Sequence, residues 1–208
     1  MDITQIRNKF QNHVPTLQNV RGQYAVLVPL IETPEGISLL YEVRSPRLRH
    51  HSGEVCFPGG RIEHGENPVQ CALRETFEEL SIPAADIEIL GQLDFLYLRS
   101  EGLMYPILAH LNSTALTHIR NNPSEVQSTF TVPVSWLQEH PPRIFRYRML
   151  PEIGEDFPYS DVGVAPNYPW SYGHMEVPVY KGLRYPLWGL TARITYWLME
   201  KMNEFTER

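Results

Sequence analysis

The stretch from Gly59 to Ile82 constrains this chain most, because it gathers negative charge at a spacing that few folds tolerate. It holds five glutamates within 24 residues: Glu63, Glu66, Glu75, Glu78 and Glu79. Its second half carries the start signals of a helix. Asn67 suits the N-cap, Pro68 suits the first helical position, and Gln70 stands where the partner of a capping box belongs.

The predicted helix has two unlike faces. At about 100° per residue, one narrow face collects the side chains expected to pack on a core: Val69, Ala72, Leu73, Thr76 and Leu80. Glu75, Glu78 and Glu79 are predicted on the opposite side. Each like-charge pair at such spacings costs a helix about 0.2–0.5 kcal/mol. A hard divalent cation, Mg²⁺ or Mn²⁺, is the usual remedy, since both prefer carboxylate oxygens. For the helix alone, a solvated acidic face is the alternative.

The charged and glycine positions of this stretch recur at fixed separations: Gly60, Glu66, Arg74, Glu75, Glu78 and Glu79, followed by Ile82. This spacing resembles the Nudix box, G-x5-E-x7-R-E-U-x-E-E-x-G-U, where U is a bulky aliphatic residue. Thr76 replaces an aliphatic residue of that pattern, and Ser81 replaces its last glycine. Ser81 must therefore end the helix without the conformational freedom of glycine.

The resemblance implies a role for each residue of the box. Glu75, Glu78 and Glu79 would hold Mg²⁺ or Mn²⁺, with Glu78 and Glu79 also counted as catalytic. Glu66 and Arg74 would brace the loop against the helix, and Gly59 and Gly60 would allow the sharp turn before it. Nudix proteins can supply one more glutamate from a later loop to act on the attacking water. Glu125 is the candidate here, and an ordinary exposed glutamate is the alternative.

A basic segment precedes the box in an otherwise acidic protein of net charge −6. Arg44 to His51 holds three arginines and two histidines, and Phe57-Pro58-Gly59-Gly60 follows shortly after. From Arg44 onward the spacing resembles the signature of the coenzyme A pyrophosphatase branch of Nudix hydrolases, L-L-x-x-R-S-x3-R-x3-G-x3-F-P-G-G. The pair Leu39-Leu40 stands one residue further upstream than in that signature.

The basic segment suits the phosphates of such a substrate. Coenzyme A carries a pyrophosphate and a separate ribose phosphate, and arginine forks bind such groups through charge-assisted, often bidentate hydrogen bonds. Arg44, Arg47 and Arg49 are the candidates, beside Gly59 and Gly60. A solvated basic loop is the alternative reading of this segment.

The expected reaction is metal-dependent hydrolysis of the pyrophosphate of coenzyme A or its derivatives, giving 4′-phosphopantetheine and adenosine 3′,5′-bisphosphate. One alternative keeps the chemistry but changes the substrate to ADP-ribose, a dinucleotide or a nucleoside triphosphate. Another is a Nudix domain that senses a nucleotide without turnover, although such domains commonly lose the carboxylates that this box retains.

Hairpins alternating with a few helices fit the fold that the resemblance implies. This is an α/β fold, a Nudix-type α/β/α sandwich with a mixed sheet, formed by residues 1–208 as a single domain. Within it we expect an N-terminal helical extension over residues 1–20, a long irregular loop over 151–173 and a C-terminal helix over 186–205.

Composition limits the partners. The net charge of −6 argues against a general nucleic-acid-binding surface, which would be basic. No stretch approaches the roughly 18–20 apolar residues of a membrane span. The start of the chain lacks the apolar segment of a signal peptide, and two cysteines form no disulfide framework, so we expect a cytoplasmic protein with a small-molecule substrate. The long loop and the terminal helix could serve a homodimer.

Overall fold

The structure is a computed structural model that describes residues 2–98 and 102–206, so Met1 and the last two residues of the expected domain lie outside it. The strands are β1 (Gly22–Thr33), β2 (Gly36–Arg44), β3 (Val55–Cys56), β4 (Gly59–Arg61), β5 (Ile87–Gln92), β6 (Leu96–Leu98), β7 (Gly102–Leu111), β8 (Val126–Pro133), β9 (Arg143–Met149), β10 (Gly173–Tyr180) and β11 (Leu187–Trp188). The helices are α1 (Ile3–Phe10), α2 (Pro68–Leu80), the 3₁₀ turn η1 (Ala84–Asp86), α3 (Ala115–His118), α4 (Val134–Glu139) and α5 (Gly189–Thr206).

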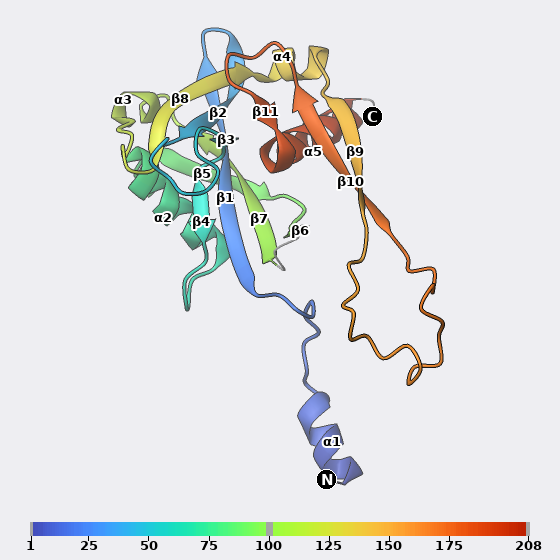
Figure 1. The fold of residues 1–208 in the computed structure, drawn as a ribbon. Helices are drawn as coiled ribbons and strands as arrows, with labels where there is room; N and C mark the ends of the chain where they lie inside the picture. The colour runs from blue at the N-terminus through green and yellow to red at the C-terminus, as the bar shows by residue number, and fades with distance from the viewer. Residues whose placement is uncertain (1, 99–101, 207–208) are drawn as a thin grey trace.

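The main sheet is mixed, as expected (Figure 1). Its strands run in the order β3-β2-β1-β7-β5, with β4 beside β1, β6 beside β7 and β8 beside β2. β1 and β7 pair in parallel, whereas β2 pairs with β1, β3 and β8 in antiparallel fashion. β9, β10 and β11 form a separate three-stranded sheet.

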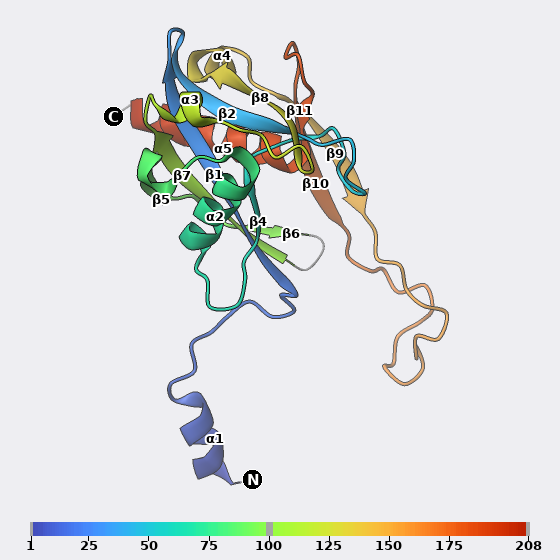
Figure 2. The same ribbon diagram turned by 90° about the vertical axis from the view of Figure 1, so that its left-hand side faces the viewer.

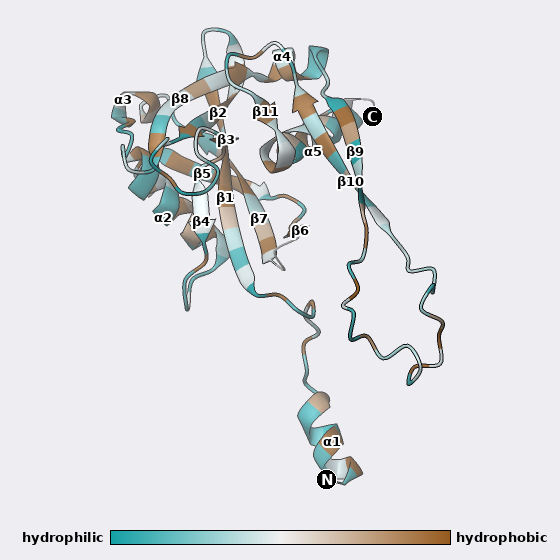
Figure 3. Ribbon diagram, viewed as in Figure 1, coloured by the Kyte–Doolittle hydropathy of each residue, from teal (hydrophilic) through white to brown (hydrophobic). Residues whose placement is uncertain are grey.

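Two hydrophobic clusters lie on opposite faces of the main sheet, because successive side chains of a strand point to opposite sides. Ala25 and Leu27 of β1 join the cluster under α2, and Val26 and Val28 join the cluster under α5. Figure 2 shows the sheet between these two helices, and Figure 3 shows the hydrophobic residues along its central strands. This arrangement confirms the α/β/α sandwich.

Two expected boundaries were wrong. The N-terminal extension expected over residues 1–20 is helical only from Ile3 to Phe10, and α1 has no buried residue. The C-terminal helix begins at Gly189 rather than at Pro186, because Leu187 and Trp188 form β11 and pair with β10.

The expected long loop connects two strands that pair with each other. Residues 150–172 contain no strand or helix and join β9 to β10. Together with the two strands they project from the body of the fold (Figure 1). Within residues 2–98 and 102–206, no helix is both long enough and apolar enough to span a bilayer.

Candidate active site

Helix α2 begins as its sequence predicts. Asn67 is the N-cap, and its side chain accepts the backbone N–H of Gln70 at 3.0 Å. The Gln70 side chain in turn accepts the backbone N–H of Asn67 at 2.9 Å, which completes the capping box. Pro68 follows in the first turn. The capping box fixes the residue at which α2 begins, and so determines which side of the helix each glutamate lies on.

The helix ends at Ser81, which takes the left-handed conformation that glycine usually supplies, with φ 59° and ψ 23°. Its backbone N–H donates to the carbonyl of Phe77 at 2.8 Å, and its hydroxyl donates to the carbonyl of Arg120 at 3.3 Å. The departure from the family pattern at this position is therefore accommodated at the cost of a strained residue.

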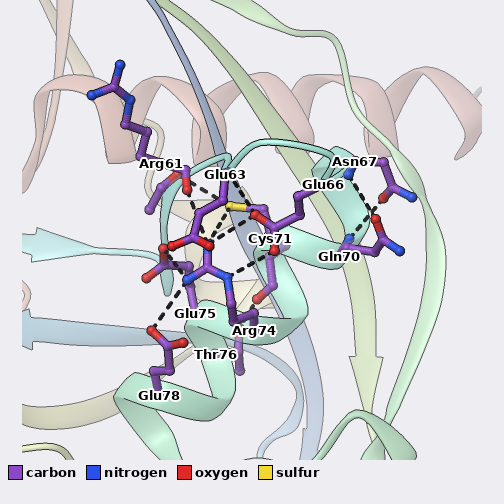
Figure 4. A network of polar contacts seen from close by, with 12 residues as sticks. Arg61, Glu63, Glu66, Asn67, Gln70, Cys71, Arg74, Glu75, Thr76 and Glu78 are labelled. Atoms are coloured by element: carbon purple, nitrogen blue, oxygen red, sulfur yellow. Dashed lines mark hydrogen bonds and ion pairs between the residues drawn. The ribbon is translucent and has the colours of Figure 1, made fainter.

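Arg74 is the centre of a polar network on the outer side of α2 (Figure 4). Its Nε and Nη2 donate to the two oxygens of Glu66 at 2.9 and 3.1 Å, which makes a bidentate fork. Its Nη1 donates to Glu75 at 2.8 Å and approaches Glu78 at 3.4 Å. Hydrogen bonds from Arg74 hold the pKa of Glu66 below its usual range. The network ties the loop that carries Glu66 to the helix.

Gly59 and Gly60 are required by close approach. A Cβ at Gly60 would collide with the carboxylate of Glu75, and a Cβ at Gly59 would collide with the backbone of Ala25 and Val26. Gly59 also donates its backbone N–H to Glu79 Oε2 at 2.9 Å. The missing side chain at Gly59 thus lets β4 pack closely on β1, and the missing side chain at Gly60 leaves room for the Glu75 carboxylate.

The expectation that Glu75, Glu78 and Glu79 share one outward face was wrong. Glu78 is exposed and Glu75 is half-buried, but Glu79 is only 4% exposed and turns toward the sheet. A helical wheel orders side chains around one axis and contains no information about the neighbouring strands. The Glu79 carboxylate instead accepts the backbone N–H of Gly59 on β4.

Glu42 of β2 is a buried carboxylate that the sequence analysis missed. Its side chain is 1% exposed, and its Oε1 accepts the thiol of Cys56 at 3.1 Å. Its Oε2 is buried and has no hydrogen-bond partner among the described residues. The signal was present in the sequence as a charged residue between Tyr41 and Val43 in a largely apolar strand.

The carboxylates of the site disfavour one another's charge. Burial raises the pKa of Glu79, and the nearby Glu42 carboxylate raises it further. Burial likewise raises the pKa of Glu42 and of Glu75, while Arg74 opposes the shift of Glu75. The carboxylate of Glu125 adds to the upward shift of all three. The local field is therefore strongly negative on the side that Arg74 does not cover.

Glu125, expected from a later loop, lies near these carboxylates just before β8. The basic segment holds it there, because Ser45 donates its backbone N–H to the carbonyl of Glu125 at 2.7 Å and its hydroxyl to the carbonyl of Pro123 at 3.1 Å. Asn122 donates to the Glu125 side chain at 3.4 Å. The two sequence motifs are thus joined through this contact.

The three arginines of the basic segment lie in different environments. Arg44 is partly buried beside Glu42, whose pKa it lowers against the effect of burial, and the Nε of Arg44 has no hydrogen-bond partner within the described chain. Arg47 and Arg49 are exposed. No ion pair within the described parts of the chain involves either of them. Both can therefore bind an anion from solution.

The donor chemistry of the site fits a hard divalent cation. Its carboxylates are oxygen donors, they raise one another's pKa, and the unpaired oxygen of Glu42 lies among them. Over residues 2–98 and 102–206, no three metal-ligating side chains yet converge on one point, and Arg74 holds Glu66 and Glu75.

Comparison with known proteins identifies the family. Residues 22–153 match the NUDIX domain. Nudix hydrolase 3 of Caenorhabditis elegans is 32% identical over 182 residues, which cover 86% of this chain and 72% of that protein. Mitochondrial coenzyme A diphosphatase NUDT8 of Mus musculus is 32% identical, covering 82% and 73%. Peroxisomal coenzyme A diphosphatase NUDT7 of Mus musculus is 28% identical, covering 71% and 63%. The chain therefore belongs to the Nudix family of hydrolases, which act on pyrophosphate bonds.

Proposed function

We propose that this protein hydrolyses the pyrophosphate of coenzyme A or a coenzyme A derivative, releasing 4′-phosphopantetheine and adenosine 3′,5′-bisphosphate. The observation that carries the proposal is the junction of the two motifs. Ser45 of the basic segment is bonded to the backbone at Glu125, and the Glu125 carboxylate acts on Glu75 and Glu79 of the box. Arginines suited to phosphates thus adjoin carboxylates suited to a metal. Two relatives named as coenzyme A diphosphatases support the same substrate.

Each residue of the site has a proposed task. Glu75, Glu78 and Glu79 would hold Mg²⁺ or Mn²⁺, which when bound supplies positive charge and lowers the pKa of a water molecule. Glu66 and Arg74 keep the loop and α2 in register, because their fork fixes both. Glu125 would accept a proton from the attacking water.

The chemistry is a displacement at phosphorus. A water oxygen forms a bond to one phosphorus, the bond from that phosphorus to the bridging oxygen breaks, and the leaving phosphate carries away the electron pair. Most of the catalysis then comes from positioning and electrostatic stabilisation. Arg44, Arg47 and Arg49 would bind the anionic groups of the substrate, and Gly60 leaves room where a side chain would collide with Glu75.

The deciding experiment measures turnover of coenzyme A against ADP-ribose, NADH and a nucleoside triphosphate, with Mg²⁺ or Mn²⁺. Glu79→Gln keeps the shape of the side chain and removes its charge, and we expect it to lose at least about a hundredfold in kcat. Glu88→Gln is the matched control, because Glu88 is an exposed glutamate on β5. It should retain full activity.

The outcomes separate the possibilities. Preferred cleavage of another substrate would keep the pyrophosphatase chemistry and reject coenzyme A. Tight nucleotide binding without any product, in either metal, would instead favour a sensor.

A second comparison tests the arginines directly. Coenzyme A and dephospho-coenzyme A differ in the 3′-phosphate alone. If Arg47 and Arg49 bind that phosphate, Arg47→Ala and Arg49→Ala should raise the KM for coenzyme A and leave the KM for dephospho-coenzyme A nearly unchanged. An equal change for both substrates would place these arginines elsewhere.

The cellular location stays a prediction. The mouse relatives are named mitochondrial and peroxisomal, whereas the sequence predicts a cytoplasmic protein. Immunolocalisation of the endogenous full-length protein decides between them. The expected lack of nucleic-acid and membrane partners and the homodimer also remain predictions.

A further inference from the structure

We infer that Glu42 of β2 is an additional carboxylate of the cation-binding site and helps Glu79 to hold the divalent ion. The inference rests on the proposed function, because it concerns the ion that this function requires. It adds a residue that neither sequence motif defines, in a strand that otherwise builds the core.

The face on which Glu42 lies follows from the alternation of β2. Leu39, Tyr41 and Val43 belong to the cluster on the α5 side of the sheet. Leu40, one residue out of phase with them, belongs to the cluster on the α2 side. Glu42 has the phase of Leu40, so its side chain projects to the face that α2 covers. This is the face on which the glutamates of the box lie.

The pairing of the strands then places Glu42 beside Glu79. Glu42 is the partner of Cys56 in the β2–β3 ladder and accepts its thiol hydrogen. Three residues further along the chain, Gly59 donates its backbone N–H to Glu79. Glu42 and Glu79 are therefore held by the two ends of one short segment. Among the charged neighbours that act on Glu79, Glu42 has the largest effect.

One oxygen of Glu42 has no partner. Oε2 is buried, and no group within the described residues bonds to it. The nearby Arg44 does not use its Nε for this purpose, since that atom is also unpartnered. Burying an unpaired carboxylate costs several kcal/mol, so buried charges in proteins are paired or coordinate metals. Glu42 thus presents a free oxygen to a cluster whose donors suit a divalent cation.

A purely structural role makes a different prediction. A protonated Glu42 could serve only as the acceptor for the Cys56 thiol. In that case its replacement would alter the stability of the fold and leave cation binding unchanged. The two roles are therefore separated by measuring the response to the ion.

The test is a Mn²⁺ titration of the full-length wild-type protein and of Glu42→Gln, in which electron paramagnetic resonance reports free Mn²⁺. Outer ligands and their supports typically contribute 10–100-fold to metal affinity. We expect Glu42→Gln to bind Mn²⁺ about tenfold more weakly or worse. The rise in melting temperature on adding Mn²⁺ should shrink in parallel. Glu42→Asp, which keeps the charge on a shorter side chain, should fall between the two and provides a second variant if the first folds poorly.

A control isolates the carboxylate. Ser38→Ala alters another buried polar side chain of β2 and should keep the wild-type affinity for Mn²⁺. If Ser38→Ala reproduced the loss, the effect of Glu42→Gln would come from disturbing β2 and the inference would be overturned.

The remaining outcomes distinguish this inference from the proposed function. Equal Mn²⁺ affinity in wild type and Glu42→Gln overturns the inference and leaves the proposed function intact. Absence of any Mn²⁺ binding by the wild-type protein overturns both.

Discussion

At the scale of single residues, Arg74 shows how much one side chain contributes to this site. Its guanidinium contacts Glu66, Glu75 and Glu78 and also donates to the carbonyl of Arg61 at 3.2 Å. A planar fork with five donors can make these contacts together, whereas a lysine ammonium offers a single point of charge. Position 74 therefore needs an arginine, because a lysine of the same charge cannot make all of these contacts together.

Arg74→Lys should therefore lower both stability and activity. We expect a loss of about 1–2 kcal/mol in the free energy of unfolding, since a bidentate pair at a half-buried position is lost. Denaturant unfolding of Arg74→Lys, Glu66→Gln and the double variant measures the coupling. A coupling energy near zero would show that the fork seen between Arg74 and Glu66 contributes nothing.

Ser81 offers a second test at the same scale. An L-residue in the left-handed conformation destabilises the folded protein by about 1–2 kcal/mol. Glycine removes this strain, but part of the gain is lost because glycine has more conformational entropy in the unfolded chain. Ser81→Gly should raise the free energy of unfolding by about 0.5–1 kcal/mol. Ser81→Ala is the control, because it keeps the strained backbone and loses the hydrogen bond to Arg120, and it should be less stable than wild type.

At the scale of elements, the junction of η1 with α3 depends on one carboxylate. Asp86 accepts the side-chain amide of Asn112 at 2.8 Å and lies 2.8 Å from a ring nitrogen of His118. The hydrogen bond from Asn112, followed by the contact with His118, lowers the pKa of Asp86. The charged form is therefore the one that this junction stabilises.

The sign of the pH dependence follows. Because the pKa of Asp86 is lower in the folded than in the unfolded protein, its contribution is present above the unfolded value, about 4, and is lost as pH falls. Asp86→Asn should be less stable than wild type at neutral pH, and the difference should shrink below about pH 4. Chemical denaturation of both proteins from neutral pH to below about pH 4 measures this difference in the free energy of unfolding. A difference that stays constant with pH would contradict the assignment.

At the scale of the whole molecule, the sheet separates two tasks. The α5 face is a packed hydrophobic cluster, where the buried Tyr41 hydroxyl and Thr195 share a hydrogen bond of 3.0 Å. The α2 face carries a smaller cluster and, beside it, the buried glutamates. Both faces therefore contribute a hydrophobic cluster, and the α2 face also carries buried carboxylates that disfavour one another's charge.

This division predicts a conflict between function and stability. In the absence of divalent ions, Glu79→Gln should be about 1 kcal/mol more stable than wild type at neutral pH, because the glutamate must bury its charge or take up a proton on folding and glutamine does neither. The same variant should be inactive. Denaturant unfolding of both proteins in the presence of a chelator measures the difference in stability. A less stable Glu79→Gln would show that the fold favours the charged form of Glu79.

The sequence by itself determined helix α2 and its capping box, because these depend on local spacing. Asn67, Pro68 and Gln70 start the helix wherever it is placed. The mixed sheet was expected only through the family resemblance, because its parallel pair joins β1 to the distant β7. The spacing of charges also indicated the family, since each residue of the box holds a fixed place on one loop and one helix.

Only the tertiary structure decided the environment of those charges. Glu79 turns inward, where it accepts the backbone N–H of Gly59 from another element, and Glu42 lies near it because β2 pairs with β3. Arg74 hydrogen-bonds to Glu66 because of the path of the loop between them, and the spacing of the motif does not specify that path. The physical reason is the same in each case. Burial and Coulomb interactions depend on distances between segments far apart in the chain, and periodicity within one segment contains no such distances.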